Sequence, residues 1–300
     1  MVDFINEHRE AYGVESICSQ LPIAPSTYYR AIDHEKHPHK RSERVKSDEA
    51  LAPIIEQIFN DNYRVYGYRK IWHSLRREGH NVARCTVARL MNALGIKGAR
   101  RGKSVITTRQ NASDVCPQDL VNREFRAAHP NELWVADYTY CSTWQGFAYV
   151  AFVIDTFNDQ IVGWKLSSSQ KTDFVLDALE QAIEARDVSV DELIHHSVPS
   201  SQYVSVTYTE RLTEAGIKPS VGSVGDSYDN ALAETINGLY KTELVHNLGP
   251  WKTYEALELA TLHWVHWYNN VRLMSWLGYR SPVEYEMIYN LSDQQQAKAA

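Results

Sequence analysis

The spacing of apolar residues predicts three helices in the first third of the chain. From Asp48 onward, Leu51 and Ile55 belong to a series with the three- and four-residue spacing of one buried helical face. Two further helical patterns end at Gly79 and Gly95, because glycine is the usual signal at a helix C-terminus. A helix, a short turn and a second helix in this order predict a helix-turn-helix arrangement.

The second half of the chain alternates between strand and helix patterns. Strands are predicted near 133–141, 147–155, 161–167, 192–196 and 218–222, and helices at about 172–186, from Val198 to Gly216, around Glu234 and at about 253–268. Three antiparallel strands followed by alternating helices and strands is the ribonuclease H-like order. The predicted fold class is therefore α/β, with a ribonuclease H-like core of five mixed strands and helices, preceded by an all-α helix-turn-helix region.

These patterns divide the chain into six segments. They are an N-terminal helical segment at 1–32 that fits a small helix-turn-helix, a charged linker at 33–47, a helix-turn-helix region at 48–110, a linker at 111–130, the catalytic core with C-terminal helices at 131–290, and a disordered tail at 291–300. His34, His37 and His39 in the first linker could be a metal cluster. We favour a solvated linker, because these histidines have no cysteines or rigid frame around them.

Charge is distributed unevenly along the chain, although the net charge is only −6. Between Asn62 and Arg109 there are 12 basic residues and one acid, Glu78. A basic run is often only a solvated face, but this one coincides with helical periodicity, which favours DNA binding. Its predicted phosphate contacts are Arg69, Arg76, Arg77, Arg84, Arg89, Lys97, Arg100, Arg101 and Lys103.

Other features limit the setting in which the chain works. No apolar stretch approaches the ~20 residues that a membrane helix needs, so no membrane association is expected. The four cysteines are scattered and form no CxxC pair, which indicates reduced thiols in a cytoplasmic protein rather than a zinc site.

Two acidic residues are placed where metal chemistry would need them. Asp137 interrupts an apolar strand, and Glu234 lies at the opening of a helix. Clustered carboxylates repel one another unless a cation is bound, and magnesium prefers oxygen ligands. At about 100° per residue, Asn230, Asn237 and Lys241 share the face of Glu234. We therefore predict that this helix packs on the opposite face, made of Leu232, Ile236 and Leu239.

Several short motifs resemble those of insertion-sequence transposases of the retroviral-integrase-like DDE superfamily. The motifs are Trp134-Val135-Ala136-Asp137, Ile161-Val162-Gly163-Trp164, His195-His196-Ser197, Ser227-Tyr228-Asp229-Asn230-Ala231, Trp267-Tyr268-Asn269-Asn270 and Ser281-Pro282. The resemblance extends from about residue 10 to residue 287. It implies a transposase that cleaves DNA and transfers strands with two Mg²⁺ (or Mn²⁺) ions.

The resemblance also implies residue roles and partners. Asp137 and Glu234 would be catalytic metal ligands, and Asn230, Asn237 and Lys241 would contact DNA. The expected partners are double-stranded DNA at the element ends and the target, further copies of the chain in a homo-oligomer on DNA, and an upstream-frame protein joined by frameshift fusion or by association. The implied location is the bacterial cytoplasm, at the nucleoid.

One position departs from the family pattern. Val198, separated from Glu234 by 35 residues, stands where the family has its second catalytic aspartate. Valine cannot bind magnesium, and strand spacing places Asp155 and Asp191 too far away; Asp226 is a weak substitute. Losing one metal carboxylate is expected to slow the reaction on the order of a thousandfold.

Two alternatives to an active transposase stay open. One is a catalytically inactive DNA-binding remnant or repressor of the same family. The other is a ribonuclease acting on RNA–DNA hybrids, against which the basic helix-turn-helix argues.

Overall fold

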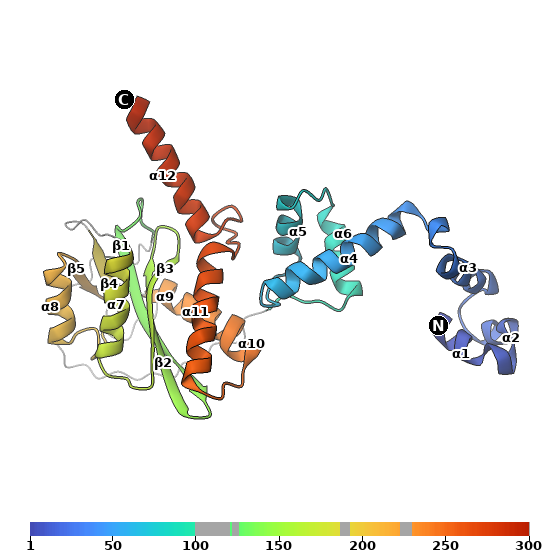
Figure 1. Ribbon diagram of the computed structural model, residues 1–300, viewed down its shortest axis with the longest axis horizontal. Coiled ribbons are helices and arrows are strands. Elements are labelled where there is room, and N and C mark those ends of the chain that lie inside the picture. Colours follow the sequence, from blue (N-terminus) through green and yellow to red (C-terminus); the bar gives the residue numbers. More distant parts are fainter. Residues whose placement is uncertain (100–120, 122–125, 187–192, 223–229, 300) are drawn as a thin grey trace. The chain divides into compact units, whose positions relative to one another are not determined.

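The structure of the chain is a computed structural model that describes residues 1–99, 121, 126–186, 193–222 and 230–299, with side chains to residue 295. Contacts divide it into two compact units (Figure 1). The first contains residues 1–58 and 83–96, and the second contains residues 59–82 and 97–300. No helix in the described part is long and apolar enough to span a lipid bilayer.

The chain begins with three short helices that share a small core. They are α1 (Val2–Tyr12), α2 (Val14–Gln20) and α3 (Pro25–Lys36). Ile5, Ile17 and Tyr28 are buried between them, and the Tyr28 hydroxyl donates to Asn6 Oδ1 at 2.7 Å. α3 begins at Pro25, without a side-chain cap, because proline already has the backbone angle of a first helical residue.

Much of the segment predicted as a charged linker is helical. α3 continues to Lys36, η1 (Pro38–Lys40) follows, and α4 (Glu43–Asp61) begins at Glu43 instead of Asp48. Glu43 lies in the first turn of α4, where a negative charge is favourable, and it pairs with Lys46 at 2.7 Å. These local charges explain an earlier start than the apolar pattern indicated. α6 (Arg84–Ala93) completes the helices of the first unit.

The second unit is built on a mixed sheet of five described strands, which confirms the predicted fold class. The strands are β1 (Leu133–Thr143), β2 (Gly146–Asp155), β3 (Gln160–Ser167), β4 (Ile194–Ser197) and β5 (Lys218–Val221). Their order is β3-β2-β1-β4-β5. β1, β2 and β3 are antiparallel, whereas β4 and β5 run parallel to β1.

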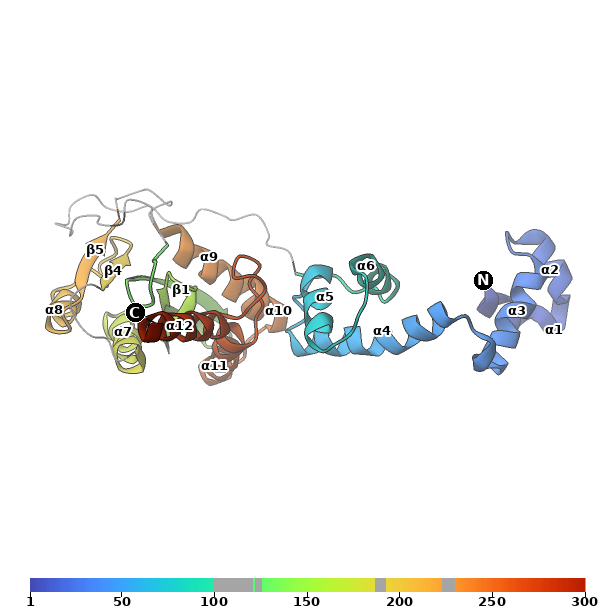
Figure 2. The ribbon, with the colours of Figure 1, turned by 90° about the horizontal axis from the view of Figure 1, so that it is seen from above.

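Helices cover both faces of this sheet (Figure 2). α7 (Asp173–Arg186) and α8 (Val206–Glu214) enclose a core that includes Trp134 and Val153. Phe152, one residue along β2, points to the other face. There its ring lies 5.2 Å from Tyr240 of α9 (Ala231–Tyr240) and 6.2 Å from Trp264 of α11 (Tyr254–Asn270). α9 therefore approaches β1 on the face opposite α7.

Two helix boundaries differ from those predicted. The helix expected directly after Val198 begins only at Val206, because the Ser205 hydroxyl caps it by accepting from Tyr208 N. Residues 291–299 of the tail, predicted to be disordered, instead continue α12 (Pro282–Ala299). Gln294 and Gln295 are good helix formers, so the helix can extend past Leu291. α9 continues without a break into the π-helical segment η3 (Lys241–Val245) and then into α10 (His246–Leu248).

Residues 59–82, predicted as part of the helix-turn-helix region, pack on the second unit. They include α5 (Tyr68–Arg77). The Tyr66 hydroxyl accepts from Leu273 N at 2.8 Å, and Trp267 Nε1 donates to Asn62 Oδ1 at 3.0 Å. Arg77 pairs with Glu284 at 2.8 Å. α5 is therefore held by contacts to residues more than two hundred positions later.

Candidate active site

Asp137 is held at the centre of β1 by two hydrogen bonds. Tyr138 N donates to its Oδ1 at 2.8 Å, and Asn237 Nδ2 of α9 donates to its Oδ2 at 2.9 Å. Burial, with a smaller contribution from the negative charge of Glu234, raises the pKa of Asp137 to about 7. The two predicted acids therefore lie close enough to influence each other, and a bound cation would relieve their repulsion.

α9 brings Glu234 and two amides to β1. Asn230 precedes the helix, is buried, and donates to the carbonyl of Ala136 at 3.0 Å. Glu234 lies in the first turn of α9 and is exposed. The carboxamide oxygens of Asn230 and Asn237 are buried and meet no hydrogen-bond partner among the described residues. The site thus combines an exposed acid with two fixed amides.

The predicted packing face of α9 is wrong in part. Its buried face is made of Ala233, Ile236, Asn237 and Tyr240, whereas Leu232 and Leu239 are only half-buried. Asn237 tolerates burial because its amide donates to Asp137. The helix is therefore rotated relative to the prediction, with the amide turned toward the sheet.

Lys241 lies beside β1 as the last member of the predicted polar set. Its Nζ is 5.0 Å from the centre of the Tyr140 ring, a cation–π geometry. Its positive charge lowers the pKa of Asp137 in opposition to burial. Lys241 therefore adds a positive charge near Asp137.

Val198 directly follows the strand that neighbours Asp137. Ala136 of β1 is in register with Ser197 of β4, so the next position along each strand is Asp137 and Val198. Val198 is half-buried and packs against the apolar cluster that contains Trp134 and Tyr203. Among the described residues, no three His, Cys, Asp or Glu side chains form a group suited to a metal ion.

Of the acids considered as substitutes for the missing aspartate, the structure describes only Asp155, which is held away from Val198. Asp155 is paired in register with Trp134 and accepts from Arg186 at 2.8 Å and from Asn131 N at 2.8 Å. It is committed to that buried network. Asp191 and Asp226 lie outside the described residues.

The two histidines before Val198 have structural partners. His195 Nε2 meets the Tyr208 hydroxyl at 3.0 Å, and His196 Nδ1 meets Ser220 Oγ at 2.8 Å. Burial lowers the pKa of His195 to about 3, so its ring is neutral at physiological pH. These side chains fix β4 to α8 and β5.

The six residues of the predicted basic set that the structure describes are all exposed. Four of them have partners within their own units: Arg69 Nε donates to the Tyr68 hydroxyl at 3.3 Å, Arg76 lies 5.2 Å from the Trp72 ring, Arg77 pairs with Glu284, and Arg89 pairs with Asp48 at 2.7 Å. Arg84 lies at the start of α6, and Lys97 follows this helix. Arg100, Arg101 and Lys103 lie outside the described residues.

Three charged residues that we did not predict gather in one cavity near α5. They are Lys70, Glu243 and Arg272. Lys70 could have been singled out from the sequence, because it directly precedes Ile71, which is buried on α5. Nothing local in the sequence links Glu243 to Arg272, since their meeting depends on the tertiary fold.

Comparison with known proteins gives matches along most of the chain. A family model described as HTH-like domain matches residues 46–104, and two models described as integrase core domain match residues 127–227 and 215–282. The transposase for insertion sequence element IS629 of Shigella sonnei is 54% identical over 292 residues, covering 97% of each chain. The putative transposase for IS986/IS6110 of Mycobacterium tuberculosis is 52% identical over 281 residues, covering 92% of this chain and 99% of the relative.

Several solved structures resemble part of the chain. The HTLV-2 integrase catalytic core domain in complex with magnesium is 18% identical, with a TM-score of 0.44. The match covers 54% of this chain and 99% of that one.

Proposed function

The chain belongs to the insertion-sequence transposases, and from that premise we propose that Asp137 and Glu234 are its catalytic acids. The family carries an integrase core and acts as a polynucleotidyl transferase in DNA transposition. The proposed reaction is cleavage of DNA at the element ends followed by strand transfer to a target.

One observation carries this proposal. The side chain of Asn237 on α9 donates to Asp137 on β1, so the helix that bears Glu234 is fixed against the strand that bears Asp137. Two elements a hundred residues apart thus bring both acids to one place. A purely structural aspartate would not need a second acid that raises its pKa.

The donor set fits a divalent cation held by two carboxylates, which would be Mg²⁺ or Mn²⁺. A bound ion of this kind stabilises charge on the phosphate oxygens during phosphodiester exchange. Asn237 orients the Asp137 carboxylate, and Lys241 offers a positive charge to a DNA phosphate. Val198 contributes no oxygen. By family the site takes two ions, and loss of the third carboxylate removes ligands for them.

The proposed partners are nucleic acid and protein. Double-stranded DNA is implied for a transposase with an HTH-like domain. We propose in addition that the chain forms a homo-oligomer on paired DNA ends. Fusion to, or association with, an upstream-frame protein is a further proposal.

A second candidate function is a catalytically inactive DNA-binding remnant or repressor. The apolar packing of Val198 favours it, because this side chain takes part in the core and offers no metal ligand. In this case the chain would occupy element ends and leave them uncut.

Replacement of Val198 by aspartate tests both candidates. The assay is Mn²⁺-dependent strand transfer with a duplex carrying the terminal repeats that flank the coding gene. We expect Val198→Asp to raise the rate by about a thousandfold. The matched control is Val198→Asn, of similar size to aspartate but without its negative charge.

The outcomes separate the proposals. If Val198→Asp is active and adding Asp137→Asn or Glu234→Gln abolishes that activity, the catalytic assignment holds. Activity that survives both acid substitutions would overturn the assignment. Strong strand transfer by the unaltered chain would contradict both the loss of activity expected from Val198 and the repressor function.

A further inference from the structure

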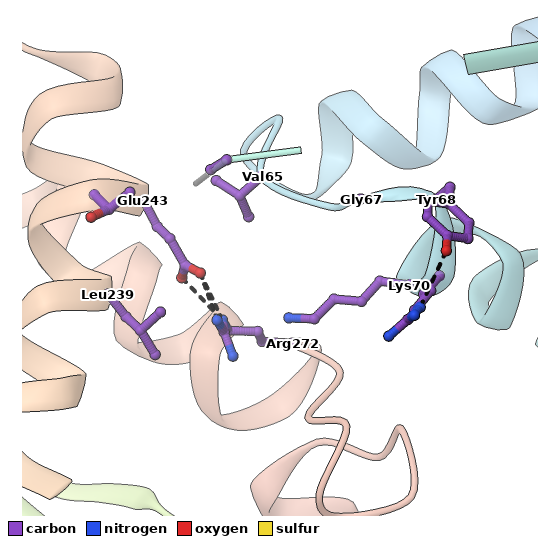
Figure 3. A pocket seen from close by; sticks show the side chains of 10 residues that line it. Val65, Gly67, Tyr68, Lys70, Leu239, Glu243 and Arg272 are labelled. Carbon is purple, nitrogen blue, oxygen red and sulfur yellow. Dashed lines mark hydrogen bonds and ion pairs between the residues drawn. The ribbon is translucent and has the colours of Figure 1, made fainter. Parts of the chain in front are cut away.

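A cavity of about 310 Å³ lies beside the first turn of α5, within the second unit. Gly67 and Lys70 line it from one side, and Glu243 and Arg272 line it from the other (Figure 3). Arg69 is also among the lining residues. Three of these five residues are basic and one is acidic. Its chemistry is therefore that of an anion site, and it is separate from Asp137 and Glu234.

The acid in this cavity is already paired. Arg272 is 6% exposed and donates to Glu243 through Nε at 3.0 Å and through Nη2 at 2.6 Å. The guanidinium also lies over Tyr268, 5.5 Å from its ring centre. A two-point contact of this kind uses both carboxylate oxygens. Glu243 thus neutralises Arg272 and leaves the other cations of the cavity uncompensated.

Lys70 is the cation that remains. Figure 3 shows its side chain extended toward Arg272. Its Nζ lies 4.9 Å from the centre of the Tyr66 ring, and within the described part of the chain it has no hydrogen-bonded or ion-paired acceptor. Burial and the charge of Arg272 lower its pKa to about 7. A partly buried ammonium group without an anion is unfavourable, and an incoming anion would remove the penalty.

The start of α5 adds to the positive character of the cavity. α5 spans ten residues, and its N-cap is Gly67, which provides no side-chain cap for the first-turn amides. A helix N-terminus attracts anions through these amides. Gly98 packs directly against this turn, since a Cβ there would come within 2.6 Å of Gly67 N. Arg69 is exposed next to the cavity.

We propose that this cavity is a phosphate site that receives a backbone phosphodiester of the bound DNA, held by Lys70, Arg69 and the first turn of α5. The inference rests on the proposed function in that DNA is the ligand. A phosphodiester carries one negative charge, which would pair with the ammonium group of Lys70. The duplex offers one such group at every nucleotide. Inorganic phosphate shares the chemistry and is the alternative source.

DNA affinity as a function of salt tests this site in the full chain. Fluorescence anisotropy with a labelled duplex would compare Lys70→Gln and Arg69→Gln with Lys165→Gln. The control removes the same charge from an exposed residue of β3 that pairs with Asp177. We expect each cavity variant to bind about tenfold more weakly and to reduce the salt slope by about 1. Lys70→Arg should restore most of the affinity.

The outcomes are decisive because Arg69 is exposed and its loss does not endanger folding. If Lys70→Gln and Arg69→Gln both behave like Lys165→Gln, the phosphate site is refuted. If inorganic phosphate raises the thermal stability of the unaltered chain and not of Lys70→Gln, while DNA affinity is equal in both, the site binds free anion and the DNA proposal is wrong. Strand transfer in the Val198→Asp background reports separately on the catalytic assignment, so the two proposals can fail independently.

Discussion

At the scale of single residues, the most informative group is Asp137. Its pKa is raised to about 7 by burial and by Glu234, while Asn237 and Tyr138 N hold the charged form in place. The two hydrogen bonds thus orient the carboxylate of Asp137 as a charged group, although burial disfavours its charge when no cation is bound. This combination is typical of a cation-binding site.

This conflict predicts a pH-dependent response to Mn²⁺. Because the folded-state pKa of Asp137 lies above its unfolded value of about 3.9, the folded chain binds a proton more tightly, and stability falls as pH rises from about 4 to about 7. The cation binds the deprotonated form, so its stabilising effect should be small at about pH 5.5 and large at about pH 8. Thermal unfolding with and without Mn²⁺ measures it.

Asp137→Asn is the control for this experiment. It should reduce the Mn²⁺ effect strongly at both pH values, because an amide is a weaker ligand that does not titrate. A stabilisation by Mn²⁺ that is equal at both pH values in the unaltered chain would contradict the prediction.

The sequence was sufficient for residues whose role depends on type and spacing. Asp137 could be proposed because a carboxylate in an apolar strand is unusual, and Glu234 because of the resemblance to the transposase motifs; their catalytic role stays a prediction. The orientation of Asn237 could not, since a helical wheel of α9 gave its leucines the buried face. The hydrogen bond to Asp137 decides the rotation of the helix, and this contact depends on a strand a hundred residues away.

At the scale of elements, the sheet was easier to predict than the helix ends. The apolar patterns located β1, β2 and β3 within a few residues, because much of each strand is buried. The starts of α4 and α8 were missed, since a charge pair and a serine cap set them. Such contacts between polar side chains and the backbone or nearby charges cannot be predicted from the spacing of apolar residues.

The close approach of β3 and α7 gives an element-scale prediction. Gly163 is buried, and a Cβ on it would lie 2.1 Å from the carbonyl oxygen of Ala178 and 2.9 Å from the Cβ of Ala182. Backbone atoms of α7 cannot move aside without shifting the helix. We expect Gly163→Ala to destabilise the chain by about 1–3 kcal/mol, measured by chemical denaturation.

Gly67→Ala is the matched control for this change. Gly67 has φ of −82°, and no atom lies within 4 Å of an added Cβ. Because Gly67 is the N-cap of α5 and alanine caps a helix less well than glycine, the change should cost only about 0.5–1 kcal/mol, less than Gly163→Ala. Equal unfolding midpoints for the two variants would contradict the packing argument.

At the scale of the whole molecule, the boundary between helical region and core does not follow the sequence pattern. The basic helical run reads as one module, and the HTH-like model also treats residues 46–104 as one. In the structure, residues 59–82 belong to the same compact unit as the core. Contacts such as Trp267 to Asn62 and Arg77 to Glu284 join distant parts of the chain, so local periodicity carries no sign of them.

Substitution of Tyr66 tests whether residues 59–82 are held to the core. It is 1% exposed, and its hydroxyl accepts from Leu273 N at 2.8 Å and donates to the Val271 carbonyl at 3.4 Å. Tyr66→Phe leaves the Leu273 amide buried without an acceptor, which costs about 1–3 kcal/mol. Amide hydrogen exchange should then accelerate both at Leu273 and in α5, because the two segments open together.

Tyr28→Phe provides the comparison in the first unit. The Tyr28 hydroxyl donates to Asn6 Oδ1 at 2.7 Å, so its loss should accelerate exchange in α1 and α3 and leave α5 and Leu273 unchanged. If Tyr66→Phe accelerates exchange at Leu273 alone, α5 is not held by the core and the division of the chain at residue 59 is wrong. If α5 and Leu273 respond together, the helix that lines the proposed phosphate site is part of the catalytic unit. DNA bound there would then be positioned by the same rigid body that carries Asp137.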